Sequence, residues 1–310
     1  MTQMPTPDAP LNIGTRGSPL ALAQAHETRD RLARAFGLAP DCFAIVPIKT
    51  TGDRVQDRAL RELGGKGLFT REIEEALLAG TIDIAVHSMK DMPVLQPEGL
   101  ILDTWLPRED VRDAFIAPGL GGIADLPQGA VVGTSSLRRR AQLLARRPDL
   151  SVVEFRGNLQ TRMRKLSEGV AQATFLAMAG LNRMGLEVGQ AAIPPEEMLP
   201  AVAQGAIGIE RRQDDARIAA MLAAIHDAPT AEVIAAERAF LATLDGSCET
   251  PIAGLARHTA EGLWLRGEIL RPDGSEVLSG ERRGTIADGP AMGEDLARDL
   301  LAQAGDGFFG

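Results

Sequence analysis

The sequence of 310 residues contains no tyrosine, two tryptophans and nine phenylalanines, so aromatic residues make up only 4% of it. Apolar residues nevertheless account for 45%, and the cores must therefore be built from Leu, Ile, Val and Ala. Few aromatics also disfavour single-stranded nucleic acid as a ligand, because such proteins stack bases on aromatic rings. The net charge of −9 likewise disfavours a general nucleic-acid binder.

Cysteine is equally scarce, since Cys42 and Cys248 stand far apart and form no CxxC motif. This excludes a disulfide framework and a cysteine-based zinc site, and the scattered histidines predict no other metal. A reduced compartment fits this cysteine usage. No run reaches the roughly 18 apolar residues of a membrane span, and residues 1–10 lack the regions of a signal peptide. We therefore expect a cytoplasmic protein with no membrane partner.

The first two-thirds of the chain alternates between predicted strands and helices. Such alternation predicts parallel sheets with helices on both faces, and ligands beyond the carboxyl ends of the strands. After His226 the pattern changes to one that predicts a separate α+β domain. We expect strands at 11–15, 43–48, 82–86, 101–104, 114–117, 130–133, 152–155, 174–178, 252–257, 263–270 and 276–283, and helices at 18–36, 69–79, 136–147, 158–166, 214–224, 232–244 and 290–303.

Three predicted strand ends carry polar motifs. GTRGSPLA at 14–21 predicts a capped helix N-terminus, which favours anions, with Arg16 as an additional donor. DIAVHSMKD ends in Lys90 and Asp91, and that carboxylate could stabilise a cation or hold a ring N–H. GTSSLRR at 133–139 is a second strand-to-helix entry. Each motif alone fits equally well with an ordinary helix cap or with a solvated ion pair, which contributes little to stability.

Positive charge is concentrated in residues 131–183, which hold ten Lys or Arg and three Asp or Glu, a local charge of +7 in a chain of −9. Because the guanidinium fork matches carboxylates, a ligand with several carboxylates is the expected partner. Nucleic acid is the rival interpretation, weakened by the lack of interleaved aromatics. Solvated helix faces account for Arg146, Arg147, Arg164 and Lys165.

Two loops contain further candidates. GGKGLF at 64–69 is not a phosphate-binding P-loop, and we expect a mobile loop whose Lys66 can reach a ligand. LDGSCETP at 244–251 places Cys248 on a turn between a helix and a strand. A turn cysteine can be an exposed, reactive thiol, although a buried small hydrophobe is the ordinary alternative.

The order of these motifs is more informative than any one of them. The series TRGSPLA, GGKGLF, DIAVHSMKDMP, REDVRDAF, GTSSLRR, RGN, LAMAGLNRMG, LPAVAQGAIGIE, AERAFL and GSCETPI resembles the porphobilinogen deaminase family from about residue 13 to 256. The resemblance implies an α/β fold of two periplasmic-binding-protein-like lobes, with mixed, largely parallel sheets, plus a smaller C-terminal α+β domain. Domain 1 would comprise 11–104 with 205–224, domain 2 105–204, and domain 3, which carries the cofactor cysteine, 225–310.

The resemblance also implies an activity. Members of the family are transferases, also called hydroxymethylbilane synthases, which serve tetrapyrrole and heme biosynthesis. They condense four porphobilinogen units head to tail with loss of ammonia, and release the linear tetrapyrrole by hydrolysis. The chain grows on a covalent dipyrromethane cofactor, which a thioether to Cys248 would hold here. We expect porphobilinogen as the small-molecule partner, no nucleic acid, and a monomer.

Residue roles follow from the same resemblance. Asp91 matches the catalytic carboxylate, and Lys66 matches the mobile loop over the cleft. The positions that match carboxylate-binding residues of the family are Arg16, Ser18, Lys90, Thr134, Ser135, Ser136, Arg138, Arg139, Arg156, Arg162 and Arg183.

One alternative from another class is a two-lobed binding protein for carboxylate ligands that has no catalytic activity. Simple binding requires neither a reactive thiol at Cys248 nor a buried carboxylate at Asp91, so both residues argue against it.

Overall fold

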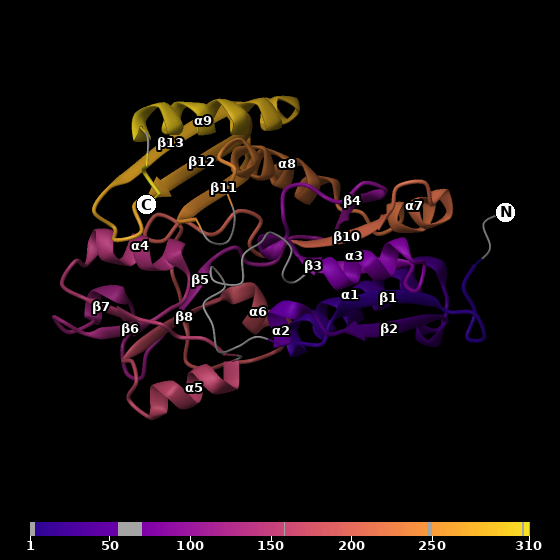
Figure 1. Ribbon diagram of the computed structural model, residues 1–310, viewed down its shortest axis with the longest axis horizontal. Helices are drawn as coiled ribbons and strands as arrows, with labels where there is room; N and C mark the ends of the chain where they lie inside the picture. Colours follow the sequence, from indigo (N-terminus) through magenta and orange to yellow (C-terminus); the bar gives the residue numbers. More distant parts are fainter. Residues whose placement is uncertain (1–3, 55–69, 158, 247–249, 306, 310) are drawn as a thin grey trace. The chain divides into compact units, whose positions relative to one another are not determined.

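The computed structural model describes residues 4–54, 70–157, 159–246, 250–305 and 307–309 (Figure 1). The chain divides into two compact units, of which the first comprises Met1–Glu109 and Gly205–Ala231 and the second Asp110–Gln204 and Glu232–Gly310. The chain therefore passes between the units three times. The division into three domains with the boundaries given above stays a prediction.

The first unit is built on a mixed five-stranded sheet with the order β2-β1-β3-β10-β4. β1, β2 and β3 run parallel, and β10 is antiparallel to both of its neighbours. The strands are β1 Leu11–Arg16, β2 Phe43–Ile48, β3 Ile84–Ser88, β4 Leu100–Trp105 and β10 Ile207–Arg212, and the helices are α1 Pro19–Phe36, α2 Thr51–Arg54, α3 Arg71–Leu78 and α7 Ala216–Ala223, with short 3₁₀ turns at Pro40–Cys42 and Met89–Asp91.

Local sequence signals explain where α1 begins and ends. The Ser18 hydroxyl caps its first turn by accepting a hydrogen bond from Ala21 N, and Pro19 occupies the first helical position. The helix ends at Gly37, whose φ of 63° is accessible to glycine at little cost. Leu32 of α1 and Ile218 of α7 pack with Ile209 of the sheet in one apolar cluster, while Ile73 and Leu77 of α3 belong to another.

The second unit contains a second mixed sheet, with the order β7-β6-β8-β5-β9. β6 is parallel to β7 and β8, whereas β5 is antiparallel to β8 and β9. The mixed α/β sheets of both units confirm the expected fold class. The strands are β5 Asp113–Ile116, β6 Val131–Gly133, β7 Ser151–Val153, β8 Ala173–Ala177 and β9 Ala191–Ala192, and the helices are α4 Leu137–Arg146, α5 Leu159–Ser167 and α6 Met178–Arg183, with a 3₁₀ turn at Ile123–Asp125.

The rest of the second unit is an antiparallel meander, β11-β12-β13, as expected from the change of pattern after His226. Helices α8 and α9 cover one face of this meander (Figure 1). They pack so closely on it that a Cβ added at Gly267 of β12 would meet both Phe240 of α8 and Leu296 of α9. These elements are α8 Ala228–Thr243, β11 Ile252–Thr259, β12 Gly262–Leu270, β13 Val277–Gly284 and α9 Gly289–Ala304, with a 3₁₀ turn at Ile286–Asp288.

Strand β10 was not predicted from the sequence. Its apolar residues Ile207 and Ile209 alternate as a strand requires, but three consecutive charged residues, 210–212, obscure the pattern. Glu210 is nevertheless fully buried. Its carboxylate has a polar partner there, since His87 Nε2 of β3 lies 3.0 Å from Glu210 Oε2. A charged residue in a central strand is therefore explained by a partner on the neighbouring strand, which sequence periodicity does not reveal.

Within the described ranges, no single helix has both the length and the apolar composition of a membrane span, and α7 and α8 satisfy those criteria only when taken together across a sharp bend. Ile218, Met221 and Leu222 of α7 are buried in the core of the first unit, which accounts for the apolar character of that helix.

Glu237 of α8 fixes the segment where the chain leaves the second unit. Its carboxylate is fully buried and accepts hydrogen bonds from Ala203 N at 2.7 Å and from Ala256 N of β11 at 2.8 Å. Ala203 has a φ of 60°, a conformation that is costly for a non-glycine residue. One side chain therefore holds a strained crossing segment and the strand that follows Cys248.

We expect Glu237→Gln to lower the free energy of unfolding of the second unit by about 2–4 kcal/mol, because the amide group of glutamine cannot accept both hydrogen bonds. Urea denaturation would measure the loss. Glu232→Gln is the matched control, since Glu232 lies on the same helix and its carboxylate is partly exposed next to His258. Equal effects of the two substitutions would contradict the role of Glu237.

Candidate active site

In the first unit, Arg16 and Ser18 lie at the carboxyl end of β1, and Lys90 and Asp91 follow the carboxyl end of β3. The two strands are parallel neighbours, so these four residues belong to the same edge of the sheet. The buried Thr15 hydroxyl connects this edge by donating to Ala21 O at 3.3 Å and to Val86 O at 3.4 Å. The fold thus brings together two motifs that are some seventy residues apart in the sequence.

A single 3₁₀ turn, Met89–Asp91, presents Lys90 and Asp91. Met89 and Met92 are buried on either side, and Met89 N donates to Ala206 O at 3.1 Å. Asp91 itself is exposed, so the expectation of a buried carboxylate was wrong. The turn carries the carboxylate past the end of the strand, while the methionines on either side of it anchor the backbone.

In the second unit, the loop from β6 to α4 places three hydroxyl groups in succession. Thr134 Oγ1 accepts from Ser136 N at 3.2 Å, and Ser135 Oγ accepts from Phe155 N at 3.0 Å. Ser136 is the N-cap of α4, with its hydroxyl accepting from Arg139 N. All three hydroxyl oxygens therefore act as acceptors that shape the loop, which leaves their O–H groups to donate to a ligand.

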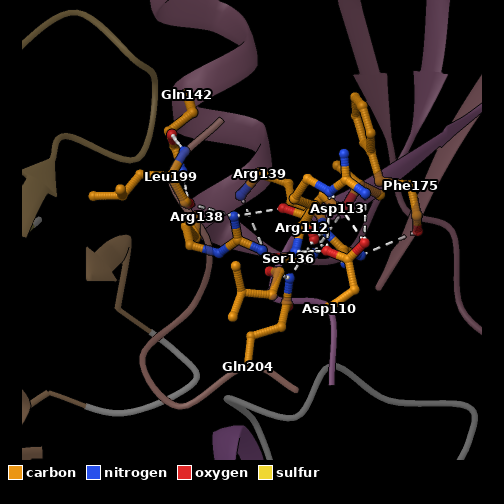
Figure 2. Close-up of polar contacts among 12 residues, drawn as sticks. Asp110, Arg112, Asp113, Ser136, Arg138, Arg139, Gln142, Phe175, Leu199 and Gln204 are labelled. Atoms are coloured by element: carbon orange, nitrogen blue, oxygen red, sulfur yellow. Dashed lines mark hydrogen bonds and ion pairs between the residues drawn. The ribbon is translucent and has the colours of Figure 1, made fainter. Parts of the chain in front are cut away.

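Two arginines in the first turn of α4 converge on one buried carboxylate (Figure 2). Arg138 Nη1 donates to Asp113 Oδ2 at 2.8 Å, and Arg139 donates to Asp113 Oδ1 through Nη2 at 2.7 Å and Nε at 3.1 Å. Gln204 Nε2 donates to the same Oδ1 at 3.0 Å. Two backbone oxygens, Leu199 O for Arg138 and Phe175 O for Arg139, complete the set.

The single negative charge of Asp113 does not by itself neutralise the two arginines that bind it. Burial alone would raise the pKa of Asp113, but the charges and hydrogen bonds of Arg138 and Arg139 hold it far below its usual value. Burial lowers the pKa of Arg138, and the charge of Asp113 opposes that shift. One carboxylate therefore serves two guanidinium groups, and Asp113 alone neutralises only half of their positive charge.

Arg162 of α5 adds to this excess. Burial, together with repulsion from Arg139, lowers the pKa of Arg162 to about 10. Its Nε donates to Gly157 O at 2.9 Å, which holds the side chain against the loop before the helix. Arg156 is half-buried in that loop, 4.0 Å from the Glu154 carboxylate. Arg156 and Arg162 thus add two guanidinium groups to those of Arg138 and Arg139, and guanidinium groups are the donors that a site for carboxylates requires.

Three of the predicted site residues remain to be placed. Arg183 is half-buried in the last turn of α6. Lys66 and Cys248 lie outside the described residues, with Cys248 in the connection from α8 to β11.

Sequence reasoning missed Asp113 and Gln204, although both lie in motifs that carried the resemblance. The available signal was an acidic residue at the start of the apolar stretch DAFIA, where a buried charge needs a partner. Two consecutive arginines elsewhere in the chain could supply one, but the sequence alone does not pair them.

We expect Asp113→Asn to destabilise the second unit at neutral pH, because it leaves two buried guanidinium groups without the carboxylate that they share. Because the pKa of Asp113 is lower in the folded protein than in the unfolded chain, the ionised carboxylate contributes its full stabilisation above the unfolded-chain pKa of about 3.9. This contribution decreases as the pH falls from there towards the pKa of the folded protein. The difference in unfolding free energy between wild type and variant should stay constant from about pH 8 to 5 and decrease below about pH 4, by up to about 1.4 kcal/mol per pH unit.

Denaturant titrations at a series of pH values would check this, with Asp295→Asn as the control on exposed α9. A difference that stays constant down to about pH 3 would contradict a depressed pKa at Asp113.

Among solved structures, the chain is similar to a periplasmic substrate-binding protein of an ABC transporter from Coxiella burnetii, with a TM-score of 0.41, 16% identity, and coverage of 74% of this chain and 96% of that one. A methionine-bound nutrient-binding protein from Burkholderia cenocepacia gives a TM-score of 0.42 at 14% identity, with coverage of 72% and 93%.

Relatives in sequence are far more similar. A porphobilinogen deaminase from Paracoccus denitrificans is 70% identical over 310 residues, covering 100% of this chain and 99% of its own. One from Nitrobacter winogradskyi is 58% identical, with 96% and 94% covered, and the chloroplastic enzyme of Pisum sativum is 55% identical, with 96% and 83% covered.

Two family models cover most of the chain. Residues 11–220 match "Porphobilinogen deaminase, dipyromethane cofactor binding domain", and residues 231–302 match "Porphobilinogen deaminase, C-terminal domain". These matches confirm the expected transferase activity and dipyrromethane cofactor. The chain belongs to the porphobilinogen deaminase family.

Proposed function

We propose that Asp91 is the catalytic carboxylate of this deaminase and that Cys248 attaches its cofactor. The observation that supports the site most strongly is the concentration of guanidinium groups around Asp113, since two arginines share that one carboxylate and the charge of Arg139 also acts on Arg162. Dipyrromethane, the substrate and the growing chain all bear acetate and propionate groups. Their carboxylates are the counter-ions that such a donor set requires.

The chemistry of the donor set fits the cofactor. The arginines Arg138, Arg139, Arg156 and Arg162 would hold its carboxylates, with O–H donors from Thr134, Ser135 and Ser136. When bound, the cofactor supplies a pyrrole whose free α-carbon is the nucleophile that receives the first substrate unit. Cys248 would provide the thioether sulfur, and its place in the connection between α8 and β11 is consistent with an attachment point.

The first unit would supply the chemical step. Asp91 would accept hydrogen bonds from pyrrole N–H groups and stabilise the positive charge that develops as ammonia leaves. Its position on a backbone turn anchored by Met89 and Met92 keeps the carboxylate in place without burying it. Lys90, Arg16 and Ser18 would bind substrate carboxylates at the same sheet edge, and Lys66 would act from its loop. Arg183 completes the proposed carboxylate-binding set.

We also propose that the enzyme works as a cytoplasmic monomer without nucleic acid or membrane partners. The sequence supports this through its net charge of −9 and its lack of a disulfide framework. Cys42 is a buried free thiol, which is consistent with a reducing compartment.

Asp91→Asn should reduce kcat by about 10²- to 10³-fold with little change in stability, because the exposed amide cannot stabilise developing positive charge. Steady-state assays of tetrapyrrole formation and thermal denaturation would measure the two effects. Glu98→Gln, which changes another exposed carboxylate of the same unit, should behave like the wild type. Activity within about twofold of wild type in Asp91→Asn would refute the role of Asp91.

Cys248→Ser should yield a protein without cofactor and with a lower denaturation midpoint, because a group bound only to the folded state stabilises it. Cys42→Ala is the control: any loss of stability there comes from the small cavity it leaves, and cofactor attachment should be retained. Retention of cofactor by Cys248→Ser would show that attachment is elsewhere.

A further inference from the structure

Arg138 Nε and Glu268 Oε2 are among the buried side-chain atoms that have no hydrogen-bond partner in the described part of the chain. Both residues are almost fully enclosed, with exposed fractions of 5% and 3%. One atom is a donor and the other an acceptor, and each bears formal charge that is costly to leave uncompensated in the interior. The two orphan atoms are therefore complementary.

The fold places Glu268 next to the helix that carries Arg138. Strand β12, which contains Glu268, packs against α4. The turn between β12 and β13 lies so close to that helix that a Cβ on Gly274 would sit 2.6 Å from Ala145 N and 2.7 Å from Ala141 O. Gly274 also has a φ of 77°, so this contact depends on glycine.

Leu199 connects α4 with β11, the strand paired with β12. Its carbonyl oxygen accepts from Arg138 Nη1 at 2.8 Å, and its side chain packs with Ala253 and Leu255 of β11. Ala253 is the residue paired with Glu268 across the β11–β12 ladder. The negative charge of Glu268 opposes, to a smaller extent than that of Asp113, the lowering of the Arg138 pKa by burial.

Strand β12 also pairs with β11, the strand that follows Cys248 in the sequence. Ile252, four residues after Cys248, is paired with Ile269, and Leu270 N donates to Pro251 O at 3.1 Å. The other carboxylate oxygen of Glu268 accepts from Arg266 Nη2 at 2.6 Å. Glu268 therefore belongs to a strand that pairs with β11 on one side and contacts α4, the helix of Arg138 and Arg139.

We propose that Glu268 is a positioning residue for Arg138. Its second carboxylate oxygen acts, with Asp113, as a counter-charge for that guanidinium, and it fixes the arginine relative to the strand pair that follows Cys248. This role rests on the proposed function of Arg138 in carboxylate binding. A simpler alternative is that Glu268 serves Arg266 alone.

A double-mutant cycle in the cofactor-free Cys248→Ser protein tests the link without substrate. Glu268→Gln should lower the equilibrium constant of folding by about tenfold or more when Arg138 is present, and by less than about twofold in an Arg138→Met background. Additive effects would overturn the proposal. If Arg138→Met does not fold, the cycle is repeated in an Arg266→Met background. The proposal predicts that Glu268→Gln still lowers the folding equilibrium constant there. Loss of that effect would show that Glu268 stabilises the protein through Arg266 alone.

The second measurement follows cofactor loading, by the mass of apoenzyme incubated with porphobilinogen. Glu268→Gln should load about three- to tenfold more slowly than wild type, whereas Glu281→Gln, on an exposed position of β13, should load at the wild-type rate. If Glu268→Gln loads cofactor at the wild-type rate, Glu268 contributes only to stability and its positioning role is refuted. Wild-type loading by Arg138→Met would instead refute the proposed function of Arg138 and leave the Arg138–Glu268 link intact.

Discussion

The carboxylate of Asp113 organises the second unit. It is fully buried at the start of β5, and it binds two arginines of α4 and the amide of Gln204 at the point where the chain leaves the unit. A buried carboxylate would be costly without these partners, and the arginines would be equally costly without it. The strand, the helix and the crossing segment are therefore held together by one charge.

The same arrangement generates the binding chemistry. Asp113 alone compensates only half of the positive charge of the two guanidinium groups, and Arg162 adds a third positive charge that interacts with Arg139. Buried positive charge is costly without a counter-ion, and we propose that a ligand with several carboxylates provides further counter-ions here. In the first unit, by contrast, the corresponding sheet edge carries an exposed acid, Asp91, on an anchored turn. In the proposed mechanism the first unit therefore combines groups that bind substrate carboxylates with the acid that stabilises a developing cation, whereas the second unit binds anionic groups.

The sequence predicted much of this fold, and the failures have physical causes. Helix α1 was predicted from Ser18 and Pro19 because its caps are local, whereas β10 was missed because Glu210 is compensated by His87 from a strand more than a hundred residues away. The candidate arginines were found from their clustering, but Asp113 was missed because its partners are distant in sequence. The exposure of Asp91 depends on how Met89 and Met92 pack, which no sequence pattern shows.

The measurement that tests this account most directly is the intact mass of the purified protein under denaturing conditions, followed by peptide mapping. The account predicts an excess mass equal to two deaminated porphobilinogen units on the peptide that contains Cys248, present on isolation or acquired when the apoenzyme is given porphobilinogen. A bare polypeptide that remains unmodified after that incubation, or an increment on another peptide, would contradict it.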